Sequence, residues 1–211
     1  MYLNTVKFMA IGERRRKERE DLRQEILDAA RELFLADGYE NVSMRKVAKR
    51  ISYSPTTIYL YFKDKTDLLH QVCEEAFRKL GEEIVRSQSL GDTPIEVLRQ
   101  GMFAYVAFGL INPRHYEVVF ISPNRGSSDG TGNSFDESMG KRAFELLSAS
   151  VASCMDAGVI KRTDVATVSQ TLWAGIHGVT SLLITHDGFP FVDRETLVAS
   201  VVDTMIEGLR S

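Results

Sequence analysis

A segment from residue 43 to residue 65 carries hydroxyl, aromatic and basic side chains whose chemistry suits contact with double-stranded DNA. It reads SMRKVAKRISYSPTTIYLYFKDK, with six basic residues and one acidic residue in a chain whose net charge is −3. Hydroxyl groups can bond to phosphate oxygens, a threonine methyl group can contact thymine, and the Arg45 guanidinium can donate two hydrogen bonds to guanine. Positive charge gathered in one part of an acidic protein is typical of nucleic-acid binding.

Two short helices around a tight turn are predicted to position these groups. Ser43 can cap the first helix, the polar residues 52–54 interrupt its apolar pattern, and Pro55 suits the first position of a second helix. The second helix would direct its hydroxyl and aromatic groups outward and bury Ile58 and Phe62. A charge run alone is usually the solvated face of a helix. The DNA-binding interpretation therefore depends on the spacing, the turn and the aromatic residues together.

Longer helices are predicted on both sides of this pair. An apolar stripe predicts a first helix that runs to Asp37 and ends at Gly38, a residue that tolerates a left-handed conformation. A second stripe predicts a helix from about Lys65 to Ser87, which would join this region to the rest of the chain. Length and composition, with 44% hydrophobic residues and five prolines in 211 residues, agree with an all-α protein.

At this point the chain resembles the TetR family of one-component transcriptional regulators. Two segments carry the resemblance: ILDAARELFLADGYENVSMRKVA at residues 26–48 and SPTTIYLYFKDKTDLL at residues 54–69. The resemblance implies about nine helices, with a three-helix helix-turn-helix DNA-binding domain at residues 13–65, a connecting helix at 65–88, and an effector-binding and dimerisation domain at 89–211. The chain departs from the family at Ser52, where glycine is usual, and at Ile51, where a small residue is usual.

The resemblance also implies which residues touch an operator. Ser43 and Arg45 would contact the backbone or a base, the second helix would line the groove, and Lys65 would hold a phosphate. The complete set expected to bind DNA is Ser43, Arg45, Lys46, Ser54, Pro55, Thr56, Thr57, Tyr59, Tyr61 and Lys65.

The second half of the chain predicts a ligand pocket and a dimer interface. The motif WAGIHG at residues 173–178 resembles a Trp and His-Gly subgroup of TetR-type C-terminal domains. Gly175 and Gly178 would let another helix approach closely, and the last two helices are apolar enough to require cover from a second subunit, which suits a palindromic operator. A pocket for a small, mostly apolar effector is expected among aromatic residues, with two polar handles. Its residues would be Phe103, Tyr105, Phe108, Tyr116, Phe120, Phe144, Trp173 and His177.

The expected function is that of a dimeric repressor that a ligand of unknown identity releases from its operator. A DNA-binding architectural or division protein, with the same helix-turn-helix and no effector, is the alternative. An enzyme is not expected, because G-x-S-x-G and H-E-x-x-H motifs are absent and the glycine-rich segment 125–134 lacks the G-K-[ST] ending of a phosphate loop. No cofactor and no metal are expected, since His70 and Cys73 have metal-ligand spacing but no second pair nearby.

The apolar stretches are too short to cross a bilayer, the start of the chain has no secretory pattern, and the cytoplasm is the expected compartment. The basic run Arg14, Arg15, Arg16 and Lys17 allows two interpretations. It can extend the first helix and form i,i+4 pairs, or it can reach DNA as an arm.

Overall fold

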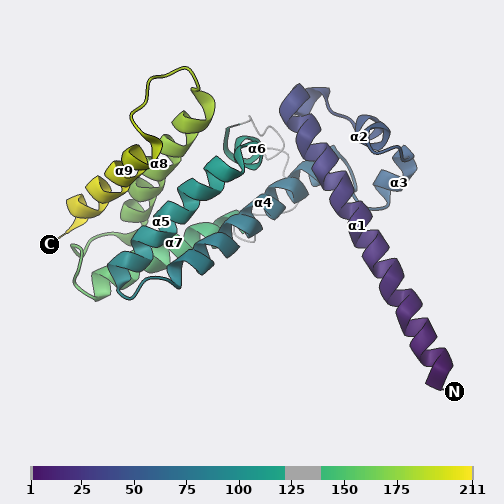
Figure 1. Cartoon of the computed structure of the whole chain (residues 1–211), viewed down its shortest axis with the longest axis horizontal. Coiled ribbons are helices and arrows are strands. Elements are labelled where there is room, and N and C mark those ends of the chain that lie inside the picture. The colour runs from purple at the N-terminus through teal and green to yellow at the C-terminus, as the bar shows by residue number, and fades with distance from the viewer. Residues whose placement is uncertain (1, 122–138, 211) are drawn as a thin grey trace. The chain divides into compact units, whose positions relative to one another are not determined.

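The protein is described by a computed structural model, in which residues 2–121 and 139–210 are placed (Figure 1). These residues form helices and contain no β-strand, so the predicted all-α class is confirmed. The glycine-rich segment 125–134 lies outside the described residues. The elements are α1 (Tyr2–Asn41), α2 (Met44–Arg50), α3 (Pro55–Tyr59), α4 (Lys65–Gln88), α5 (Pro94–Ile111), α6 (Pro113–Tyr116), the π-helical turn η1 (Glu117–Ile121), α7 (Met139–Asp156), α8 (Val165–Thr185) and α9 (Arg194–Leu209).

The chain divides into two compact units, and the division falls inside α4. Among the described residues, the first unit holds residues 2–73 and the second holds residues 74–121 and 139–210. None of the described helices is both long enough and apolar enough to cross a lipid bilayer. The domain boundaries expected from the sequence stay predictions.

The first unit is built around the buried stripe of α1. Ile26, Ala30 and Phe34 are almost completely buried, as are Ile58 and Phe62 from the region of α3. The predicted end of the first helix is nearly right. The helical conformation breaks at Gly38, whose φ of 74° is positive, but the chain then resumes a helical turn as far as Asn41. The basic run after Gly12 is helical, so it is the extension of α1 and not a flexible arm.

In the second unit α5 is the central helix, and it packs against α7, α8 and α9 (Figure 1). Thr93 and Glu96 form a capping box that fixes the start of α5. The Arg99 guanidinium donates two hydrogen bonds, of 2.8 and 2.9 Å, to the Asp203 carboxylate and so joins α5 to α9.

The two glycines of the WAGIHG motif have different surroundings. A Cβ atom on Gly175 would collide with the Met205 sulfur, so α9 packs directly on α8 at this point, as the sequence predicted. Nothing lies within 4 Å of the corresponding position on Gly178. Within the described chain, close packing is therefore confirmed for Gly175 only.

Candidate functional site

Serine caps position the two short helices of the first unit. The Ser43 hydroxyl accepts a hydrogen bond of 3.2 Å from the Lys46 amide, which confirms the predicted cap of α2. The Ser54 hydroxyl accepts a 3.1 Å hydrogen bond from the Thr57 amide and lies 2.9 Å from the Thr57 hydroxyl. Both amides also donate to the carbonyl of the same serine, so the hydroxyl groups give a second acceptor to first-turn amides that have no i,i−4 partner.

The turn between α2 and α3 is a Schellman motif. The Tyr53 amide donates to the Ala48 carbonyl at 2.9 Å, and the Ser52 amide donates to the Lys49 carbonyl at 3.3 Å. This motif needs a left-handed residue after the helix, and glycine is the usual choice. Here the position belongs to Ser52, whose φ is 61°, and it is the one non-glycine residue with positive φ among those described.

The outer side of α3 exposes large side chains. Tyr59 is 55% exposed and Leu60 is 70% exposed, whereas Ile58 and Phe62 are buried. The predicted directions of these side chains are confirmed for Tyr59, Ile58 and Phe62. Leu60 was not predicted from the sequence as part of this surface, although it lies between two aromatic residues that were.

The basic residues of the segment divide into two groups. The Lys65 ammonium donates a 2.9 Å hydrogen bond to the Tyr39 carbonyl and lies 4.1 Å from the centre of the Tyr39 ring. Lys46 pairs with Asp37 at 2.9 Å. Arg45 is exposed, and its guanidinium has no bonding partner among the described residues. Arg45 is therefore available to an external partner, while Lys65 and Lys46 also hold the unit together.

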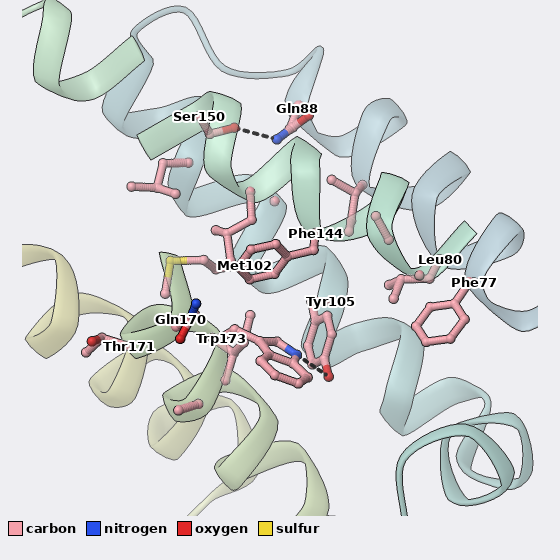
Figure 2. A pocket seen from close by; sticks show the side chains of 18 of the residues that line it. Phe77, Leu80, Gln88, Met102, Tyr105, Phe144, Ser150, Gln170, Thr171 and Trp173 are labelled. Atoms are coloured by element: carbon pink, nitrogen blue, oxygen red, sulfur yellow. Dashed lines mark hydrogen bonds between the residues drawn. The ribbon is translucent and has the colours of Figure 1, made fainter. Parts of the chain in front are cut away.

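The second unit contains a cavity of about 870 Å³ between α4, α5, α7 and α8 (Figure 2). Its walls are mainly apolar, and none of the described residues that line it is charged. The lining residues are Phe77, Leu80, Ile84, Gln88, Leu98, Gly101, Met102, Tyr105, Phe120, Gly140, Ala143, Phe144, Leu147, Ser150, Thr167, Gln170, Thr171, Trp173, Ala174 and Ile176.

Two hydrogen-bonded pairs supply polar groups to the wall (Figure 2). The Gln88 side-chain amide donates to the Ser150 hydroxyl at 2.8 Å, and that hydroxyl donates in turn to the Leu146 carbonyl at 2.9 Å. The Trp173 indole donates to the Tyr105 hydroxyl at 3.2 Å. The cavity can therefore meet a ligand with apolar contacts over most of its surface and with hydrogen bonds at these two places, and Gln170 and Thr171 add further polar side chains to the lining.

A polar network stands behind Tyr105. Its hydroxyl lies 3.2 Å from the Tyr116 hydroxyl, which also bonds to Nδ1 of His177. Burial raises the pKa of Tyr105 to about 12 and raises the pKa of Tyr116 further, while burial lowers the pKa of His177. All three groups are thus neutral at pH 7, and the neutral Nδ1 can accept a hydrogen bond from the Tyr116 hydroxyl.

Four of the eight residues predicted for a pocket line this cavity: Tyr105, Phe120, Phe144 and Trp173. Tyr116 and His177 lie behind Tyr105 in the network.

Phe103 and Phe108 do not line the cavity. Phe103 lies under the Arg99 guanidinium, 5.2 Å from it, and Phe108 is buried in the core. Gln88 and Ser150 were not found from the sequence, although Gln88 continues the i,i+4 stripe of Leu80 and Ile84, and a polar residue in such a stripe is a usable signal.

Two family models match the chain. The model described as bacterial regulatory proteins of the tetR family matches residues 26–72, and the tetracyclin repressor-like C-terminal domain matches residues 98–205, which is half of the chain. The chain belongs to the TetR family. The family is one of bacterial regulatory proteins, not of enzymes, and this chain carries its helix-turn-helix domain and a tetracyclin repressor-like C-terminal domain.

A relative that is described as an HTH-type transcriptional regulator agrees with this assignment. The transcriptional regulator AcrR of Shigella flexneri is 34% identical over 86 residues, which is 40% of this chain and 40% of AcrR. The two proteins thus align over less than half of their lengths. The predicted Trp and His-Gly subgroup stays a prediction.

Solved structures show the same fold. A TetR family regulator from Marinobacter aquaeolei VT8 has a TM-score of 0.73 at 17% identity, covering 93% of this chain and 99% of that one. FadR from Bacillus subtilis, solved in complex with stearoyl-CoA, has a TM-score of 0.71 at 21% identity and covers 89% of this chain and 99% of its own.

Proposed function

We propose that this TetR-family regulator binds a palindromic operator as a homodimer, represses transcription, and is released from DNA by a small, neutral, mostly apolar ligand. The observation that carries the proposal is the large uncharged cavity in the second unit. Ligand sites in proteins are commonly apolar cavities of about 300–1,000 Å³ with a few placed polar groups, and this cavity has those properties.

DNA recognition is assigned to residues 13–65. The exposed side of α3, including Thr56 and Tyr59, would enter the major groove, and the free guanidinium of Arg45 would reach a base or a phosphate from α2. Lys46 and Lys65 are also proposed contacts, but their bonds to Asp37 and Tyr39 give them a second role in holding the domain. The remaining proposed contacts are Ser43, Ser54, Pro55, Thr57 and Tyr61.

The ligand is proposed to be neutral where the cavity encloses it. An isolated charge buried among apolar walls would lose its hydration without gaining a partner. FadR from Bacillus subtilis was solved with stearoyl-CoA. An acyl chain would suit the walls described here, but no lysine or arginine among the described lining residues would receive the phosphates of a coenzyme A group. A long or polycyclic apolar body with one hydrogen-bonding group fits better, with Gln88 and Ser150 as its partners.

Residues 89–211 are proposed to form the effector-binding and dimerisation domain, with α8 and α9 at the dimer interface. The outward face of α8 supports this, because Leu182 is 47% exposed and the positions near it carry small residues such as Gly178 and Ser181. Small residues let two helices approach closely, and the open space beside Gly178 is where a second subunit would pack. Two subunits would present two helix-turn-helix units to the two halves of a palindrome.

Release of DNA follows from linkage between the two sites. A ligand that binds better to the DNA-free conformation lowers operator affinity by its differential affinity, which is typically about 1–3 kcal/mol of coupling. The cavity also favours this function over that of an architectural or division protein, because a protein without an effector is expected to have a close-packed interior.

Trp173 offers a direct test, because it is the only tryptophan of the chain and it lines the cavity. A ligand that enters should change the tryptophan emission and, at the same concentrations, weaken operator binding. Ligands that change the emission without ever changing operator affinity would contradict the proposed release.

A second test addresses the DNA contacts. Arg45→Ala should weaken operator binding by about 1–3 kcal/mol. The matched control is Arg162→Ala, since Arg162 is an exposed arginine of the second unit. Equal affinities of the two variants for the operator would remove Arg45 from the proposed interface.

A further inference from the structure

The N-terminal half of α1 carries basic and acidic residues on different faces. Residues 13–25 include six basic and five acidic residues, so the segment is almost neutral as a whole. At about 100° per residue, however, four arginines fall within about 100° of one another around the helix, and every acidic residue of the segment falls outside that sector. These four, which we call the arginine stripe, are Arg15, Arg16, Arg19 and Arg23.

The arginine stripe faces the same side of α1 as the core of the first unit. Further along the helix, the same angular sector is occupied by Ile26 and Ala30, which are completely buried against the rest of this unit. The stripe is thus the continuation of the buried stripe beyond the end of the core. In Figure 1 the N-terminal half of α1 extends past α3.

Contacts within the unit fix the inner end of the stripe next to the proposed DNA-binding surface. The Arg19 guanidinium lies 5.7 Å from the centre of the Tyr61 ring, and Tyr61 lies two residues after the end of α3. The Arg23 guanidinium lies 5.6 Å from the centre of the Phe62 ring and donates to the Gln71 side chain at 2.8 Å. Arg19 and Arg23 are therefore held against the α3 region.

The two arginines at the N-terminal end of the stripe make no ion pair or hydrogen bond within the part of the chain that the structure describes. Arg15 and Arg16 lie about one helical turn beyond Arg19, both are exposed, and among the described residues neither has an ion pair or hydrogen bond. Arg14, on the acidic side of the helix, is by contrast paired with Glu18 at 3.2 Å. Two unpaired guanidinium groups next to a DNA-reading surface have the charge and geometry to meet phosphates.

We infer that the arginine stripe is an additional phosphate-binding surface, through which α1 holds the DNA backbone flanking the groove that α3 enters. This inference rests on the proposed DNA-binding function. It goes beyond the domain shared with the family, because the matched region begins at residue 26 and the stripe precedes it. Phosphate contacts carry little base information, so the stripe adds affinity and lengthens the protected site without changing its sequence.

The test compares the double variant Arg15→Gln/Arg16→Gln with Lys17→Gln in the full chain, using the best site selected from genomic fragments. Lys17 is an exposed cation on the opposite side of the same helix and serves as the matched control. Loss of two phosphate contacts should reduce the slope of log affinity against log salt by about 2 per protomer. Between 0.05 and 0.2 M salt the wild type should lose about tenfold more affinity per protomer than the double variant does. The hydroxyl-radical footprint should shorten at its outer edges, and the ratio of specific to non-specific affinity should stay the same.

Failure of the inference and failure of the proposed function would give different experimental results. A double variant with the same salt slope and footprint as Lys17→Gln would overturn the inference and leave the proposed function intact. A wild-type protein that prefers no DNA sequence would overturn the proposed function itself. Binding to vesicles of phosphatidylserine and phosphatidylcholine that the double substitution abolishes, with an unchanged DNA salt slope, would assign the stripe to membranes and overturn the inference.

Discussion

Replacing Ser52 by glycine should stabilise the protein, because Ser52 holds a conformation that suits glycine. Its φ is 61°, and the Schellman bonds of Ser52 and Tyr53 fix it there. For a residue with a Cβ atom, the left-handed conformation costs about 1–2 kcal/mol. Glycine avoids that cost, but it gives the unfolded chain more freedom, which opposes folding by about 0.5–1 kcal/mol. The expected net gain in the free energy of unfolding is about 0.5–1 kcal/mol.

Urea unfolding measures this gain directly. The midpoint of Ser52→Gly should rise with no change in the denaturant slope, and the melting temperature should rise by about 1–4 °C. Ser52→Ala is the control, since alanine keeps the Cβ atom and the Ser52 hydroxyl has no bond among the described residues that could be lost. An equal gain from alanine, or a loss of stability with glycine, would refute the argument that backbone strain is stored at this turn.

Three further predictions concern other parts of the molecule. Ala143→Leu would fill part of the cavity, so ligand binding measured by tryptophan emission should weaken about tenfold or more, while operator affinity should not change. An unaltered ligand affinity would place the ligand elsewhere. Lys65→Met removes the bond to the Tyr39 carbonyl and should lower the free energy of unfolding by about 1 kcal/mol in urea, whereas an unchanged value would mean that water replaces the bond. Burial lowers the pKa of His177, so as the pH falls the imidazole is protonated in the unfolded chain before it is protonated in the folded one. The contribution of His177 to the free energy of unfolding should therefore be fully present above about pH 6.5 and should decrease as the pH falls from there to the lower folded pKa. His177→Gln should remove that part of the pH dependence, and melting curves in which it persists would contradict the assignment.

Local rules in the sequence were enough to predict the helix-turn-helix. The Ser43 cap, the proline at the start of α3 and the break at Gly38 each depend on residues within a few positions of one another. The strain at Ser52 could also be expected, because a turn of this length after a helix calls for a left-handed residue. These features need no knowledge of tertiary packing.

The wall of the cavity was only partly predictable, because it depends on contacts between distant residues. Helix α5 carries aromatic residues in several directions, and periodicity alone does not tell which of them meets a cavity. Phe103 lies against the Arg99 guanidinium and is not among the residues that line the cavity, whereas Tyr105, two positions further along α5, is. The pair formed by Gln88 and Ser150 joins residues that are 62 positions apart, and no local pattern links them.

The most direct test of this account is an operator-binding titration in the presence and absence of a ligand that changes the emission of Trp173. The operator is first selected by the purified protein from genomic fragments. The account predicts a palindromic site whose affinity falls by about 5- to 150-fold at saturating ligand, in line with typical coupling energies. A site that is bound equally well with the cavity full and empty would contradict the claim that the cavity controls DNA binding.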